Sequence, residues 1–119
     1  MAKSLNRHFQ FVGTSKDVRS GQLWYPAADV YQTPEGWVVK VELAGVSPDD
    51  IKITIEGSVL HIEGSRKDGT CAAGADYHQM EISYSSFEKT LRFPSAIDDA
   101  KVDHEFENGL LLIHLKKGD

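Results

Sequence analysis

Glu105-Phe106-Glu107-Asn108-Gly109-Leu110-Leu111-Leu112-Ile113-His114-Leu115 is the stretch that decides the fold, because it has the pattern of a β-hairpin closed by Asn-Gly. A type I′ turn requires positive φ at both central residues, which Asn and Gly tolerate. A two-residue loop then places Glu107 opposite Leu110 and His104 opposite Ile113. One predicted face is apolar except for a single histidine, and it consists of Val102, His104, Phe106, Leu111, Ile113 and Leu115.

Each face of this hairpin raises a question about burial. On the apolar face, a neutral His104 needs a hydrogen-bond partner. We expect His104 to lie at the margin of a sheet, where it can find such a partner. On the other face, Leu110 and Leu112 stand beside acidic residues and His114. Either a neighbouring chain or arm covers these two leucines, or they belong to an exposed adhesive surface.

Apolar and polar residues alternate through most of the chain from Trp24 onward, with turn residues at intervals of about eight to twelve positions. This pattern predicts an all-β fold of seven or eight short antiparallel strands, in a sandwich or barrel. The residues expected to share a face within one strand are Trp37, Val39, Val41 and Leu43; Ile51, Ile53 and Ile55; Leu60 and Ile62; His78, Met80, Ile82 and Tyr84; and Phe87, Leu91 and Phe93.

Two segments lack this alternation. Residues 1–23 contain Leu5, Phe9, Phe11 and Val12 without a sustained period, which predicts a flexible N-terminal arm. Residues 65–76 are rich in Gly, Ala, Lys and Asp and form a loop longer than most hairpin loops, so a functional or disordered segment is expected. The predicted domain spans residues 24–117, and residues 118–119 form a truncated tail.

Length and composition limit the number of domains, the kinds of partner and the location that can be expected. A chain of 119 residues is one domain, and its net charge of -5 argues against nucleic-acid and acidic-membrane partners. No apolar run reaches the roughly 20 residues that span a bilayer, and no signal peptide is evident, so a cytoplasmic location is expected. The single cysteine, Cys71, is either a tolerated loop thiol or a redox-sensitive link between two chains.

No catalytic or metal site is expected from the sequence. The five histidines show no paired short spacing with one another or with cysteine. The serines lack a strained Gly-x-Ser-x-Gly turn, Cys71 has no fixed base nearby in sequence, and no glycine-rich phosphate loop precedes a helix. We therefore predict that the chain is not an enzyme and uses no cofactor. What remains is apolar surface suited to docking a peptide or strand.

The chain resembles the small heat-shock proteins, the α-crystallin-domain family, from Trp24 to Lys117. The resemblance lies in PAADVYQTPEGWVVKVELAGVSPDDIKITIEGSVLHIEG (26–64), in Tyr77-His78, in SYSSFEKTLRFPSAIDDAKVDHEFENGLLLIHLKK (83–117) and above all in the Asn-Gly-Leu-Leu signature. It implies an immunoglobulin-like antiparallel β-sandwich of seven to nine strands. It also implies an ATP-independent holdase that binds non-native client proteins and prevents their aggregation, without nucleotide or metal.

The resemblance also implies three sets of binding residues. A groove between residues 51–56 and 86–94 is expected to bind peptides or clients, with Ile51, Ile53, Ile55, Leu91 and Phe93 as its lining. A homodimer is expected in which the long loop crosses to the early strand of a neighbour, with Ala28, Asp29, Val30, Tyr31, Asp76, Tyr77 and His78 at the interface. The N-terminal arm, with Leu5, Phe9, Phe11 and Val12, is expected to help bind clients.

This sequence departs from the family pattern in three places. It ends at residues 116–119 without an Ile-x-Ile tail, which favours a dimer or small oligomer over a large shell. His104 stands where the family commonly has alanine. Ile82 and Ser85 stand where the family has arginine and glycine, which weakens any transfer of interactions there.

Two other functions stay open. One is an adaptor of the related CS co-chaperone type, which docks to a folded chaperone and usually lacks the swapped strand. The other is a purely structural assembly subunit that holds no client. A stable dimer favours the holdase, and a monomer at high concentration favours the adaptor.

Overall fold

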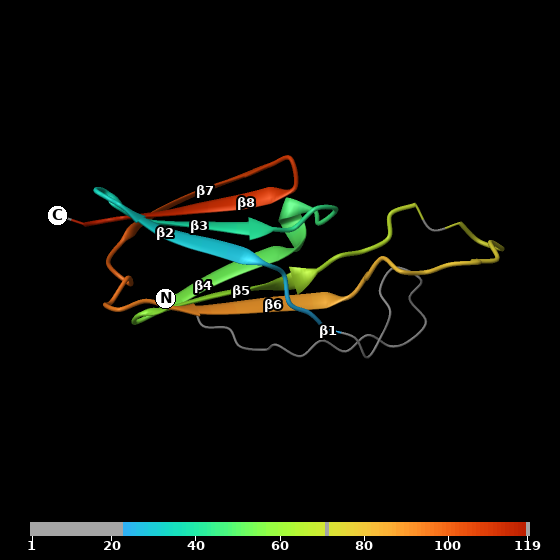
Figure 1. Ribbon diagram of the computed structural model, residues 1–119, viewed down its shortest axis with the longest axis horizontal. Coiled ribbons are helices and arrows are strands. Elements are labelled where there is room, and N and C mark those ends of the chain that lie inside the picture. Colours follow the sequence, from blue (N-terminus) through green and yellow to red (C-terminus); the bar gives the residue numbers. More distant parts are fainter. Residues whose placement is uncertain (1–22, 71, 119) are drawn as a thin grey trace.

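The structure is a computed structural model that describes residues 23–70 and 72–118. Two four-stranded β-sheets stack face to face in it, as Figure 1 shows. A short 3-10 helix, η1 (Pro48–Asp50), precedes β4. The strands are β1 (Leu23–Trp24), β2 (Ala28–Thr33), β3 (Gly36–Glu42), β4 (Ile51–Glu56), β5 (Val59–Ser65), β6 (Ser86–Arg92), β7 (Lys101–Glu107) and β8 (Leu110–Lys116).

The strand order is β1-β6-β5-β4 in the first sheet and β2-β3-β8-β7 in the second. Neighbouring strands are antiparallel except for β1 and β6, which run parallel. The predicted all-β sandwich is therefore confirmed, with eight strands among the described residues. The predicted arm lies outside the described residues, apart from Leu23, which begins β1.

The hairpin of β7 and β8 forms with the predicted register. Asn108 and Gly109 have φ of 55° and 79°, as a type I′ turn requires. The ladder pairs Glu107 with Leu110 and His104 with Ile113. The local pattern was sufficient here because the turn sets the register of both strands.

Gly109 is also required by close packing. Its carbonyl oxygen accepts a 2.7 Å hydrogen bond from the Leu43 amide, which ties the turn to the end of β3. A Cβ atom built on Gly109 would lie 3.0 Å from both Cα and Cβ of Ala44. The turn therefore needs glycine both for its positive φ and for the space beside Ala44.

The core lies between the two sheets and follows the alternation of the strands. Leu111, Ile113 and Leu115 of β8 are almost completely buried, whereas Leu110 and Leu112 on the outer face are half-buried. The other buried core residues are Val39, Val41, Leu43, Val46, Ile55, Leu60, Ile62, Phe87, Phe93 and Ile97. Burying a side chain of this size stabilises the fold by roughly 1.5–3 kcal/mol relative to leaving it in water.

Arg66 fastens the base of the long loop that follows β5. Its Nε donates a 2.8 Å hydrogen bond to the Ser83 carbonyl oxygen, and its Nη1 donates a 3.0 Å bond to that of Ala44. Its guanidinium carbon stands 3.7 Å from the centre of the Trp24 ring, a cation–π geometry. Burial lowers the pKa of Arg66, while the nearby Tyr84 raises it. The two ends of the loop are thus held together at Arg66.

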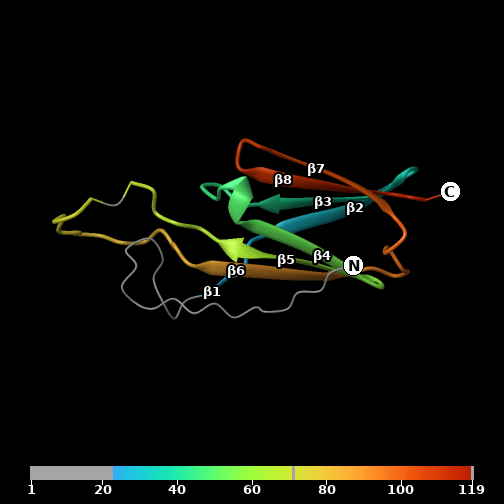
Figure 2. The same cartoon turned by 180° about the vertical axis from the view of Figure 1, so that it is seen from behind.

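The expected strand through His78, Met80, Ile82 and Tyr84 is wrong for the single chain. Residues 66–85 outside position 71 contain no strand in the structure, and both views show the loop extending beyond the sheets (Figures 1 and 2). Tyr77, Met80 and Ile82 are exposed. The alternation is present, but no described strand lies beside this segment to pair with it.

Replacing Gly109 with valine should destabilise the fold by more than about 1 kcal/mol, because a β-branched residue is strained at positive φ. Urea unfolding followed by circular dichroism measures the change. Gly69→Val is the matched control, since Gly69 has open space where a Cβ would lie, and it should stay within about 0.5 kcal/mol of the parent. Equal stability of the two variants would refute the turn assignment.

Candidate functional site

The candidate site is an apolar groove between two sheet edges. β4 is the last strand of the first sheet and β7 the last strand of the second, and neither has a partner on its outer side within the described residues. The groove between them has a volume of about 450 Å³. An edge strand presents unpaired backbone amides and carbonyls, so it can pair with an added strand.

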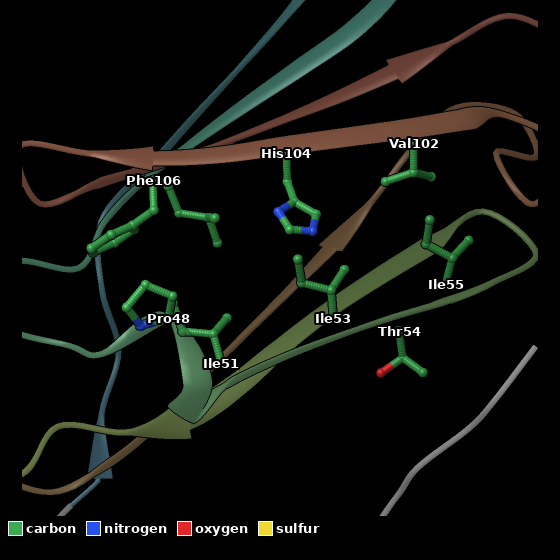
Figure 3. Close-up of a pocket in the computed structure, with 9 residues that line it drawn as sticks. Pro48, Ile51, Ile53, Thr54, Ile55, Val102, His104 and Phe106 are labelled. Carbon is green, nitrogen blue, oxygen red and sulfur yellow. The ribbon is translucent and has the colours of Figure 1, made fainter.

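Alternation along both strands supplies the lining of the groove. Ile51, Ile53 and Ile55 extend from β4 on one face, because residues two apart in a strand point the same way. β7 provides the facing wall, and its side chains stand opposite those isoleucines in Figure 3. The full lining is Pro48, Ile51, Ile53, Thr54, Ile55, Val102, His104, Phe106 and Leu111.

The local sequence explains how β4 begins at the groove. Ser47 caps η1 by accepting a hydrogen bond from the Asp49 amide at 3.3 Å. Pro48 suits the first position of this turn because its missing N–H has no partner there in any case. Ile51 follows at once as the first residue of β4, so the turn places Pro48 and Ile51 together at one end of the groove.

The predicted second wall of the groove must be corrected. We expected residues 86–94 to face residues 51–56, but β5 lies between β4 and β6 in the sheet. Leu91 is half-buried against the core, and Phe93 is buried with its ring edge-to-face on Trp37, centroids 5.2 Å apart. Neither residue lines the groove, whereas Ile51, Ile53 and Ile55 do.

Val102, His104 and Phe106 line the groove although the hairpin pattern had not indicated this. Their predicted position on one face of the hairpin is correct, but that face was expected to be core. In the structure β7 is an edge strand, and this face of it borders the groove instead of the closed core. Val102 therefore remains 39% exposed. The signal was the hairpin register itself, combined with the mixed chemistry of a face that carries a histidine.

His104 occupies the middle of the β7 wall and points into the groove (Figure 3). It is exposed, so water can reach its ring nitrogens. The expected position at the margin of a sheet is confirmed, because β7 is an edge strand. The groove therefore has one polar position, flanked on β7 by Val102 and Phe106.

The predicted dimer residues fall into two separate places. Ala28, Asp29, Val30 and Tyr31 lie in β2, the other edge of the second sheet, where Val30 and Tyr31 are exposed. Asp76, Tyr77 and His78 lie in the long loop and are also exposed. One chain does not bring the two sets together, so their pairing between chains stays a prediction. The predicted arm residues Leu5, Phe9, Phe11 and Val12 lie outside the described residues.

Comparison with known proteins identifies the family. Residues 29–119 match the family described as Hsp20/alpha crystallin. The chain belongs to this family. The resemblance seen in the sequence is thereby confirmed, and the CS-type alternative is not favoured.

Several members of the family are similar to this chain. Small heat shock protein C2 of Rickettsia felis is 34% identical over 77% of the chain, and the 22.7 kDa class IV heat shock protein of Pisum sativum is 36% identical over 88%. The chain spans 60% and 54% of these two relatives. The structure of heat shock protein 16.0 from Schizosaccharomyces pombe superposes with a TM-score of 0.71 at 28% identity, covering 79% of this chain and 87% of that one.

Within residues 23–70 and 72–118, no helix is long and apolar enough to cross a bilayer.

Phe93→Ala and Phe106→Ala should differ in cost, because only Phe93 belongs to the core. Removing a buried phenylalanine costs about 3–5 kcal/mol, so Phe93→Ala should approach that range. Phe106→Ala should cost about 1–2 kcal/mol, because Phe106 is half-buried beside the groove. Chemical denaturation of both variants measures the difference. A larger loss for Phe106→Ala would mean that the wall of the groove is misplaced.

Proposed function

We propose that the chain is an ATP-independent holdase chaperone that binds partly unfolded proteins in the groove between β4 and β7. The main support for this proposal is the apolar groove that lies open between β4 and β7, the edge strands of the two described sheets in a small heat-shock sandwich. Partly unfolded proteins expose extended apolar segments, which aggregate by pairing edge to edge. A groove with this chemistry competes for the same segments.

The geometry suits an extended client segment. The edge of β4 or β7 offers backbone hydrogen bonds to any sequence, which makes binding tolerant of the client's identity. The spaces beside Ile53 and Phe106 take apolar side chains at alternate positions of the segment. Binding of this kind is reversible and driven by mass action, so no ATP is needed. The proposed chaperone is accordingly not an enzyme and needs no nucleotide.

We also propose that two chains form a homodimer through β2 and the long loop. β2 is an edge strand among the described residues, and residues 76–78 stand in a loop that extends away from its own sandwich. A second copy can therefore place this segment beside β2, where the two could pair as neighbouring strands. The expected absence of nucleic-acid and membrane partners and the cytoplasmic location stay predictions.

The holdase proposal predicts that equimolar protein suppresses thermal aggregation of a model client without ATP, measured by light scattering. Ile53→Asp should weaken binding of an apolar client peptide about tenfold, because a charge replaces buried apolar surface in the groove. Lys52→Asp is the matched control, since Lys52 is exposed on the opposite face of β4, and it should bind as the parent does. Absence of suppression at severalfold excess would refute the proposal. Equal weakening by both variants would place clients outside the groove.

The dimer proposal predicts that the chain sediments as a dimer and becomes a monomer when residues 69–81 are replaced by a short Gly-Ser linker. This change retains Arg66 and Ser83, and the Arg66 amide donates a 2.9 Å hydrogen bond to the Ser85 carbonyl, so the loop ends remain adjacent. The variant should unfold cooperatively, which shows that its sandwich is intact. A parent chain that is monomeric at high concentration would contradict the dimer, as would a shortened variant that stays dimeric.

A further inference from the structure

The outer face of the first sheet carries a cluster of three potential metal ligands that is separate from the groove. β5 and β6 are neighbours in the sheet, and their register places Glu63 directly opposite Glu88. His61 precedes Glu63 by two positions, so both lie on the face opposite the core residues Leu60 and Ile62. One ligand atom from each of His61, Glu63 and Glu88 lies within 4.8 Å of the others.

The imidazole of His61 is oriented by a hydrogen bond at its other nitrogen. Its Nδ1 lies 2.9 Å from Thr90 Oγ1 on β6. Its Nε2 lies 3.5 Å from Glu63 Oε1 and 3.8 Å from Glu88 Oε1. When Nδ1 carries the proton and donates a hydrogen bond to Thr90 Oγ1, the lone pair of Nε2 faces two carboxylate oxygens. Histidines that bind metals are held in this way, with the second ring nitrogen fixed by a hydrogen bond.

Glu63 supplies an independent indication that this cluster holds a cation. Its side chain is only 6% exposed, and Oε1 is buried without a hydrogen-bond partner. Burying a carboxylate without a compensating partner is costly, and a second carboxylate directly across the strands adds repulsion. Among the ion pairs of the described residues, lysine contacts Asp50 and Asp103 rather than Glu63. A cation between His61, Glu63 and Glu88 would compensate the buried Oε1 of Glu63.

We propose that His61, Glu63 and Glu88 bind one divalent transition-metal ion, with Zn²⁺ as the best fit. Zinc takes tetrahedral nitrogen and oxygen ligands at about 2.0–2.2 Å, which sets them about 3.3–3.6 Å apart. The observed separations of 3.5 and 3.8 Å are close to this spacing. An imidazole ligand disfavours Ca²⁺ and Mg²⁺, which prefer oxygen. Three protein ligands leave a fourth position for water.

The proposed ion would join β5 to β6 on the face opposite the client groove. Its predicted effect is therefore on stability, through binding to the folded chain alone. This inference does not depend on the holdase proposal, because it is tested without a client.

Isothermal titration of the metal-free full chain with Zn²⁺ tests the proposal, together with thermal unfolding in Zn²⁺ or Mg²⁺. One saturable zinc site per chain is expected, with a higher Tm in Zn²⁺ only. His61→Gln and Glu63→Gln should abolish this site, and Thr90→Val should weaken it by about 10–100-fold. His114→Gln is the matched control, since His114 contacts a single carboxylate at 3.7 Å, and it should leave binding unchanged.

Co²⁺ provides a second readout through its tetrahedral visible absorption, which should appear in the parent and in His114→Gln but be absent from His61→Gln. All variants should keep the parent's circular dichroism spectrum, because the changed side chains lie outside the core. The proposal is overturned if the parent shows no saturable zinc site, or if His61→Gln binds zinc as tightly as the parent.

Discussion

The position of β8 between β3 and β7 is the constraint on which the rest of the structure depends. Its inner face buries Leu111, Ile113 and Leu115, and the Asn108-Gly109 turn ties it to β7 with one register. The Gly109 carbonyl also bonds to Leu43 at the end of β3, so three strands meet at one turn. A one-residue slip of β8 would turn His114 and Lys116 toward the core in place of Ile113 and Leu115, and this penalty selects a single arrangement.

The edges of the sandwich follow from that arrangement and account for its candidate functions. With β8 central, β7 becomes one edge of its sheet and β2 the other, while β4 is left as an edge of the opposite sheet. β4 and β7 then enclose the apolar groove, and β2 is the strand proposed to meet a second chain. The proposed metal cluster lies on the outer face of β5 and β6. The proposed binding of clients, dimerisation and metal binding would therefore use separate surfaces.

The parts of the fold that were predicted correctly are those specified by short stretches of sequence. The hairpin register, the positive φ of Asn108 and the burial of Leu111 follow from turn chemistry and period-two alternation. Predictions that required strand order were less successful. Leu91 and Phe93 were assigned to the groove because alternation identifies an apolar face without saying which strand it meets. The segment around Met80 alternates like a strand but belongs to neither sheet of the described residues.

The sequence by itself determined which side chains share a face of each strand, where the central hairpin turns, and that the chain resembles the small heat-shock proteins. Only the tertiary structure decided which strands are neighbours and which are edges, because that order depends on how all the strands pack at once. In the folded chain the second wall of the groove consists of Val102, His104 and Phe106, and not of Leu91 and Phe93. The tertiary structure also brought His61 and Glu63 beside Glu88, a cluster that no spacing along the chain could indicate, since β5 and β6 pair across a long loop.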